Sequence, residues 1–260
     1  MFEVSAWLHR FAKQSVFRPC VPEGACVYAV GDIHGRRDLL VSLLLKIWTD
    51  AAGKAQRPTL VFLGDYVDRG PGSKDVVELV HSCIRADWEV VALRGNHDQL
   101  LLDFCRDPSV YRGWKAFGAS ETLRSYGVEP PAGDDPRDIA RAHQAFLAAL
   151  PEPHFKFLDG LAYAHSIGDY FFVHAGVRPG VPFERQSPQD LMWIRDEFLA
   201  SDKVLDKVVV HGHTPGEAPV NMPNRICVDT GAYATNRLTA VVLSGDRREF
   251  LMADGGAQLG

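Results

Sequence analysis

Short apolar runs alternate with segments of helical periodicity over the first hundred residues. Residues 25–31, 59–64 and 89–94 are apolar runs of strand length bounded by turn residues, which predicts buried strands. The segments between them, 37–48 and 73–85, repeat apolar residues at helical spacing. This order of strand, helix, strand, helix and strand predicts a sheet of the α/β class.

The pattern then changes. Residues 99–126 and 136–150 have helical periodicity, and a loop rich in Pro, Gly and Asp separates them. We expect no strand before Tyr170, so a helical insertion over about residues 100–165 interrupts the sheet. Strands are then expected at 170–174, 207–211, 225–229 and 238–243, with a helix at 188–200.

Length and composition are those of a globular protein. The chain has 260 residues, of which 46% are hydrophobic and 23% charged, and this is enough for a core without disulfides. We expect a single domain over residues 1–260, with its core at about 25–250. The five cysteines form no CxxC pair and their number is odd, which favours reduced thiols in a cytoplasmic protein.

The net charge and the lengths of the apolar runs argue against nucleic acids and membranes as partners. The net charge of −5 argues against broad nucleic-acid binding, because no basic field dominates. No apolar run approaches the length of a membrane span, so we expect no stable membrane insertion. Apolar residues near positions 2–11 predict an amphipathic helix docked on the main domain, with membrane-surface docking as the alternative.

Polar residues that can bind metals follow the apolar runs. The strings GDIHG (31–35), GDYVDRG (64–70) and GNHD (95–98) each come directly after a predicted strand. Asp32 and His34 are two residues apart, so they share a face in an extended chain and can grip one cation together. Each string alone also fits a turn at a strand end. Functional loops converge where strands end, so the strings jointly predict a metal site.

Two later histidine strings complete a resemblance. HAG at 174–176 and GHT at 212–214 follow the three earlier strings, and the five together resemble, in order, the signatures of PPP-type phosphoprotein phosphatases within the calcineurin-like metallophosphoesterases. The similarity spans residues 31–214 and is greatest to the short bacterial and bacteriophage enzymes. It implies a four-layer α/β/β/α sandwich with a helical insertion. It also implies two divalent cations, for which we expect Mn²⁺, with Fe and Zn as alternatives.

The resemblance also implies a role for each matching residue. The implied metal ligands are Asp32 and His34 for the first ion, Asp65 as a bridge, and Asn96, His174 and His213 for the second ion. His211 is then expected to be structural or to support a ligand. His97 would protonate the leaving group with Asp68 as its partner, and Arg69, Arg195 and Asn96 would bind the substrate phosphate.

Two of these residues have alternative interpretations. Asp68 also fits a turn residue that caps its own loop, although the presence of His97 favours a catalytic pair. Arg195 also fits the solvated face of a helix at 188–200.

The implied activity is hydrolysis of phosphoserine and phosphothreonine, and also of phosphotyrosine. A hydroxide that bridges the two metals would attack phosphorus directly, without a phosphoenzyme. The partner is therefore expected to be a phosphorylated protein or a small phosphoester. A symmetrical diadenosine-polyphosphate hydrolase is the alternative, because it shares the metal-binding strings and a similar PGS sequence at 71–73. Asp68 favours the phosphatase. An inactive scaffold protein would lack ligands or the acid, and none is missing here.

Overall fold

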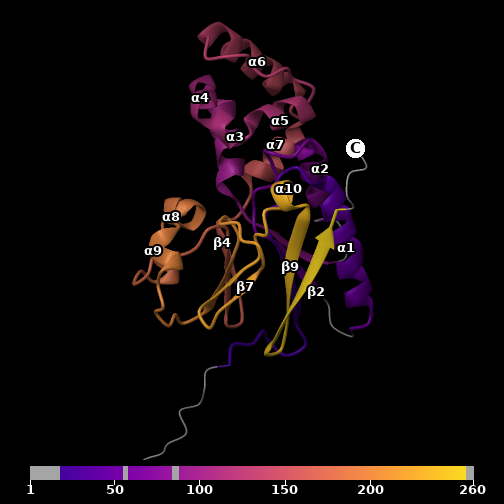
Figure 1. Ribbon diagram of the computed structural model, residues 1–260, viewed down its shortest axis with the longest axis vertical. Coiled ribbons are helices and arrows are strands. Elements are labelled where there is room, and N and C mark those ends of the chain that lie inside the picture. Colours follow the sequence, from indigo (N-terminus) through magenta and orange to yellow (C-terminus); the bar gives the residue numbers. More distant parts are fainter. Residues whose placement is uncertain (1–17, 55–57, 84–87, 256–260) are drawn as a thin grey trace, which may run out of the picture.

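Two five-stranded sheets form the centre of the protein (Figure 1). The computed structural model describes residues 18–54, 58–83 and 88–255, so the helix expected near residues 2–11 lies outside the described residues. The first sheet has the order β10 (Arg247–Asp254), β9 (Arg237–Ser244), β1 (Cys26–Val30), β2 (Pro58–Phe62), β3 (Glu89–Ala92). The second has the order β4 (Ala164–Ile167), β5 (Tyr170–Val173), β6 (Val208–His211), β8 (Arg225–Cys227), β7 (Val220–Asn221).

Helices flank the two sheets and form a separate lobe. Helices α1 (Arg37–Ala52) and α2 (Ser73–Cys83) cover the first sheet, and α8 (Pro188–Trp193) and α9 (Asp196–Leu199) lie beside the second (Figure 1). A one-turn helix, α10 (Ala232–Thr235), precedes β9. The insertion between β3 and β4 consists mainly of α3 (Asn96–Arg106), α4 (Tyr111–Trp114), α5 (Ala119–Ser125), α6 (Pro136–Ala149) and α7 (Glu152–Asp159).

The alternation of side chains along each strand explains the layers. In β1, Tyr28 and Val30 belong to the core between the first sheet and its helices, whereas Val27 and Ala29 belong to the core between the two sheets. In β5, Phe172 faces the first sheet and Phe171 packs toward α8 and α9. Successive side chains point to opposite faces of a strand, so both sheets are buried on two sides. The predicted α/β/β/α sandwich is therefore confirmed.

Parallel pairing directs the loops that follow six strands toward one edge. β1, β2 and β3 are parallel neighbours, as are β5, β6 and β8. In an open α/β sheet, ligands bind outside the carboxyl ends of such strands. The strings singled out in the sequence follow β1, β2, β3, β5 and β6 at these ends.

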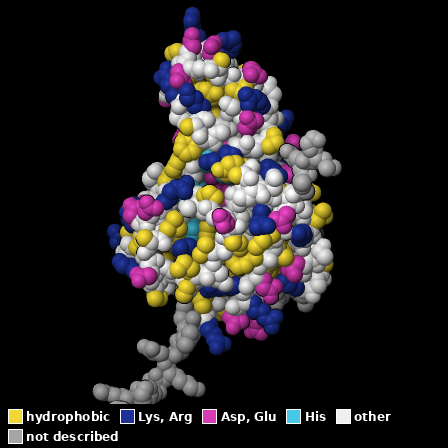
Figure 2. All heavy atoms as spheres, in the orientation of Figure 1, with side chains coloured by type: hydrophobic (Ala, Val, Ile, Leu, Met, Phe, Trp, Pro, Cys, Tyr) yellow, Lys and Arg dark blue, Asp and Glu magenta, His cyan; other side chains and the backbone are white. Residues whose placement is uncertain are grey.

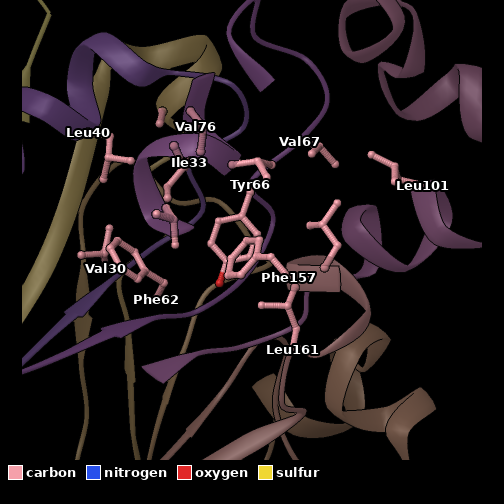
Figure 3. Packing of buried hydrophobic residues seen from close by; sticks show 14 of the residues in the cluster. Val30, Ile33, Leu40, Phe62, Tyr66, Val67, Val76, Leu101, Phe157 and Leu161 are labelled. Carbon is pink, nitrogen blue, oxygen red and sulfur yellow. The ribbon is translucent and has the colours of Figure 1, made fainter. Parts of the chain in front are cut away.

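The insertion packs onto the first sheet through apolar side chains. The Tyr66 ring, which follows β2, lies 5.7 Å from that of Phe157 in α7, and its hydroxyl donates to the carbonyl of Leu93 at 2.8 Å (Figure 3). Trp114 and Phe104 pack inside the insertion, with 5.1 Å between their rings. Burial of these aromatic rings joins the insertion to the residues of the GDYVDRG string.

Three expectations about the elements were wrong, and strand β10 was not predicted. Strand β4 forms before Tyr170 because it pairs antiparallel with β5, and β10 pairs along the whole of β9 although charged residues interrupt its apolar pattern. The helix expected at 188–200 breaks at Ile194, where the backbone is extended, into α8 and α9. The helix expected at 99–126 is divided into shorter pieces, with Pro108 and Gly118 at two of the breaks.

Candidate dinuclear metal and phosphate site

The loops at the candidate site have an unusual backbone. Among the described residues, six that are not glycine have positive φ, and five of these are candidate site residues: His34, Asp65, Asp68, Arg69 and His213. The left-handed conformation costs free energy for such residues, and it persists where surrounding structure enforces it, often at functional sites. The backbone is therefore shaped to bring these side chains together.

Two glycines allow the loops to approach the carboxylates closely. A Cβ atom at Gly95 would overlap Asp65 Oδ1, and one at Gly212 would overlap Asp32 Oδ1. Only glycine leaves room for the carboxylates at these positions. The GNHD and GHT strings thus need their glycines for contact with two candidate metal ligands.

His34 and Asp65 form the first part of the site. The Nδ1–H of His34 donates to the carbonyl of Val67 at 2.9 Å, which leaves Nε2 as the free lone pair, 3.5 Å from Asp65 Oδ2. Burial lowers the pKa of His34 well below its ordinary value, which favours the neutral ligating form. Metal-binding histidines commonly donate their second N–H to a carbonyl in this way.

His174 and Asn96 form the second part with the same Asp65. His174 Nδ1–H donates to the carbonyl of Leu63 at 2.9 Å, so its Nε2 is a lone pair. That lone pair lies 3.0 Å from Asn96 Oδ1 and 3.5 Å from Asp65 Oδ2. Three acceptor atoms therefore converge without a proton between them, an arrangement that a cation would stabilise.

His213 completes the second part of the site. Its Nδ1 lies 3.2 Å from His174 Nε2, and its buried Nε2 has no hydrogen-bond partner among the described residues. Burial and the nearby His174 lower the pKa of His213. Carboxylate or imidazole atoms of Asp65, His174 and His213 all lie within 4.8 Å of one another, as do those of His34, Asp65 and His97. These two sets share Asp65, as a bridged pair of cations requires.

Asp32 lies against the second set. Its carboxylate accepts the backbone N–H of His213 at 3.0 Å. Burial and the neighbouring carboxylates of Asp229 and Asp65 raise the pKa of Asp32 well above its ordinary value. The carboxylates repel each other in the buried site, and divalent cations would remove that cost. The residues thus fit two cations, while the role of Asp32 on the first ion stays a prediction.

His97 and Asp68 form a buried pair beside these groups. His97 Nδ1 lies 2.7 Å from Asp68 Oδ2, and His97 Nε2 lies 3.8 Å from Asp65 Oδ2. Burial raises the pKa of Asp68 to about 7 and lowers the pKa of His97 to about 3. Both pKa shifts favour the uncharged forms of the two groups. Asp68 therefore contacts the Nδ1 side of the imidazole, and Nε2 points toward Asp65 and the site.

A small cavity opens over these residues. It measures about 190 Å³ and is lined by seven of the predicted residues together with Phe117, Pro215, Asp229 and Tyr233. The seven are His34, Asp65, Arg69, Asn96, His97, Arg195 and His213. In Figure 2, charged side chains of both signs meet histidine near the junction of the insertion and the sandwich. Predicted residues of four of the five strings therefore line one cavity, and His174 of the remaining string contacts two of them, Asn96 and His213.

The two arginines enter the cavity from opposite sheets. Arg69 follows β2, and its Nη1 donates to the Tyr233 hydroxyl at 2.7 Å while its guanidinium lies 4.5 Å from the Tyr233 ring centre. Arg195 lies at the break between α8 and α9, and its Nη1 donates to Thr214 Oγ1 at 3.2 Å. Arg195 is exposed, as the alternative interpretation expected, but it lies between two short helices at the cavity and not on the face of a helix over 188–200. Two guanidinium groups at one cavity suit a phosphate.

Three residues that contact or line the site were not predicted from the sequence. Asp98, the last residue of GNHD, accepts the backbone N–H groups of Asp65, Tyr66 and Gly95 at 2.8, 3.0 and 2.9 Å. Asp229 follows β8 at the same sheet edge, and its position after an apolar strand was an available signal. Trp114 donates its indole N–H to Asp68 at 2.7 Å, a contact across 46 residues that no local pattern reveals.

His211 lies outside the cluster of ligand atoms. It is buried at the end of β6, with its ring 5.1 Å from that of Phe198. This position agrees with the expectation that it is structural.

A family model and several relatives match the chain. The model described as calcineurin-like phosphoesterase matches residues 27–246. Serine/threonine-protein phosphatase 1 of Salmonella typhimurium is 28% identical over 218 residues, which cover 82% of this chain and 89% of the relative. The symmetrical bis(5′-nucleosyl)-tetraphosphatase of Neisseria gonorrhoeae is 28% identical over 279 residues, which cover 88% of this chain and 96% of the relative.

Solved structures have the same fold. A candidate diadenosine tetraphosphatase, 23% identical, aligns with a TM-score of 0.64 over 92% of this chain and 100% of its own. A cold-active protein tyrosine phosphatase, 19% identical, aligns with a TM-score of 0.54 over 89% of this chain and 81% of its own. Within the described residues, no helix has the length and apolar character needed to span a membrane.

Proposed function

The chain belongs to the calcineurin-like phosphoesterase family, and we propose that within this family of hydrolases it is a phosphomonoesterase acting on phosphoserine and phosphothreonine, with phosphotyrosine as a further substrate. The observation that carries this proposal is the 2.7 Å contact between His97 and Asp68 beside a site for two cations. A phosphomonoester of an alcohol needs a proton donor for its leaving oxygen, and a histidine held by a carboxylate supplies one.

Two groups of side chains would each bind one metal ion, and one carboxylate would bind both ions. His34 and Asp32 would hold one ion, His174, His213 and Asn96 the other, and Asp65 both. Bound divalent ions lower the pKa of water, neutralise phosphate charge and orient the substrate. Mixed nitrogen and oxygen ligands suit Mn²⁺, our expected ion, and also Fe and Zn.

Arg69 and Arg195 would orient the phosphate. Each guanidinium can donate two parallel hydrogen bonds to phosphate oxygens, and together they balance the charge that develops in the transition state. Asn96 lies between the second metal set and the cavity, so its side chain can contact the substrate as well as the ion.

His97 would complete the reaction from the side of the leaving group. In the substrate complex the negative charge of the phosphate would favour the protonated imidazole, and Nε2 would then give its proton to the ester oxygen as the bond from that oxygen to phosphorus breaks. The water that forms the new bond to phosphorus loses a proton, so the products are an alcohol and phosphate. Asp68 keeps the imidazole oriented and stabilises the proton on it until transfer.

The alternative substrate is a dinucleoside polyphosphate, and the relatives named for both activities support either. The cavity of about 190 Å³ favours the phosphomonoester. Sites that enclose a whole drug-sized ligand usually measure roughly 300–1,000 Å³. This cavity suits a phosphoryl group and its nearest atoms, and a dinucleotide would lie mostly outside it.

A competition assay tests the proposal. The Mn²⁺-loaded protein is offered a phosphoserine peptide, p-nitrophenyl phosphate and diadenosine tetraphosphate separately, and kcat/KM is compared. We expect the phosphopeptide and p-nitrophenyl phosphate to be cleaved with higher kcat/KM than the dinucleotide. Preferential cleavage of the dinucleotide would replace the proposal with the alternative.

A further inference from the structure

A short segment of the insertion encloses the Asp68–His97 pair. It comprises residues 114–122, from the end of α4 into α5, and we call it the clamp segment. Trp114 Nε1 donates to Asp68 Oδ2 at 2.7 Å, and Thr122 Oγ1 donates to Asp68 Oδ1 at 2.6 Å. Both side chains are fully buried, so neither reaches the substrate cavity. Each carboxylate oxygen of Asp68 therefore has a donor from the clamp segment.

The clamp segment also contacts the neighbours of Asp68. The Arg69 backbone N–H donates to the Gly118 carbonyl at 3.4 Å, and the Phe117 ring lies 5.5 Å from that of His97. Gly118 has φ +99°, and a Cβ there would lie 2.5 Å from the Arg69 nitrogen. Glycine is therefore required where the segment meets the left-handed backbone of Asp68 and Arg69.

We propose that Trp114 and Thr122 are positioning residues for proton donation by His97, an inference that rests on the proposed phosphomonoesterase function. Asp68 Oδ2 accepts from both Trp114 and His97, and Oδ1 accepts from Thr122, so the three donors fix the plane of the carboxylate. Loss of one donor would let the carboxylate rotate and the imidazole follow. Small misplacements of a catalytic group can lower rates by roughly 100-fold.

The insertion is then part of the catalytic apparatus. Its helices also pack through a cluster of apolar side chains, and that packing by itself requires no hydrogen bond to Asp68. Thr122 in addition accepts the backbone N–H of Asp68 at 2.8 Å and lies 3.1 Å from Ser73 Oγ. The fold of the insertion and the orientation of the proton donor therefore depend on the same two side chains.

Leaving-group dependence tests this inference. Trp114→Phe keeps an aromatic ring but removes the N–H, and Thr122→Val keeps the shape but removes the hydroxyl. A phosphoserine peptide releases an alkoxide that needs a proton, whereas p-nitrophenyl phosphate releases a stable phenolate. We expect both variants to lower kcat for the phosphopeptide by about 10- to 100-fold and kcat for p-nitrophenyl phosphate by less than about 3-fold.

Two variants serve as controls. Thr122→Ser keeps the hydroxyl, so its phosphopeptide rate should be close to that of the wild-type protein. Trp88→Phe removes an indole that packs against Tyr28 and not against Asp68, so both rates should stay unchanged. Equal losses on both substrates, or no loss on either, would overturn the inference. If Trp114→Phe fails to fold, the Thr122 pair decides. A wild-type protein that cleaves neither monoester would instead refute the proposed function.

Discussion

Replacement of Asp98 by alanine should destabilise the protein and displace the loops that carry the site residues. The buried carboxylate accepts three backbone N–H groups, from Asp65, Tyr66 and Gly95. Hydrogen bonds to a charged group contribute roughly 1.5–3 kcal/mol each, and a buried donor left without a partner carries a penalty of similar size. The Asp98→Ala change leaves all three donors unpaired.

The burial of Asp98 offsets part of this loss. Burial raises the pKa of Asp98 to about 7, which means that the charged carboxylate is less stable in the folded protein than in water. We therefore expect a net loss of about 3 kcal/mol in the free energy of unfolding, less than the sum of the three bonds. For a chain of this length that corresponds to a decrease in Tm of about 6–12 °C. Asp98→Asn retains one acceptor oxygen and should lose less.

Thermal denaturation and hydrolysis of p-nitrophenyl phosphate measure the two effects together. Activity should fall as well, because the N–H groups of Asp65 and Tyr66 fix the loop that carries Asp65, which we propose as the bridging ligand. Asp103→Ala is the matched control on the same helix, since that side chain bonds to Gln99 and Arg106 at a partly exposed position and should change stability by less than about 0.5 kcal/mol. An Asp98→Ala protein with unchanged Tm and activity would refute the reasoning.

Three further changes have distinct expected outcomes. Gly212→Ala should lower metal affinity by about 10- to 100-fold in an isothermal titration, because the added Cβ displaces Asp32 from its place beside His213, and wild-type affinity would contradict the close approach. Asp65→Asn should abolish turnover of p-nitrophenyl phosphate while circular dichroism stays unchanged, and full activity would exclude a shared metal ligand. Tyr233→Phe should raise KM about 2- to 10-fold with little change in kcat, because Arg69 loses a hydrogen bond at 2.7 Å, whereas a loss confined to kcat would assign Tyr233 a different role.

The strand-end residues were predictable because each lies next to its strand in the sequence. The apolar runs before Asp32, Asp65 and Asn96 are long enough to identify buried strands, and parallel strands bring their carboxyl ends together. The same rule applies to His174. Metal-binding chemistry at this edge therefore follows from local pattern and topology alone.

The remaining features depend on contacts between distant residues. Trp114 and Thr122 reach Asp68 across 46 and 54 positions, so no periodicity could assign them to the site. Strand β10 is specified by its partner β9 rather than by its own charged sequence. The break that brings Arg195 to the cavity lies inside a segment whose local signals all favour helix, and tertiary packing overrides them.

The most direct test of the account is a metal titration of the metal-free protein. Mn²⁺ is added in steps while bound metal per chain and hydrolysis of p-nitrophenyl phosphate are measured in parallel. The two sets of candidate ligand atoms that share Asp65 predict two bound ions per chain and activity that reaches its maximum only when both are present. Full activity without metal, or binding of no ion by the wild-type protein, would contradict it.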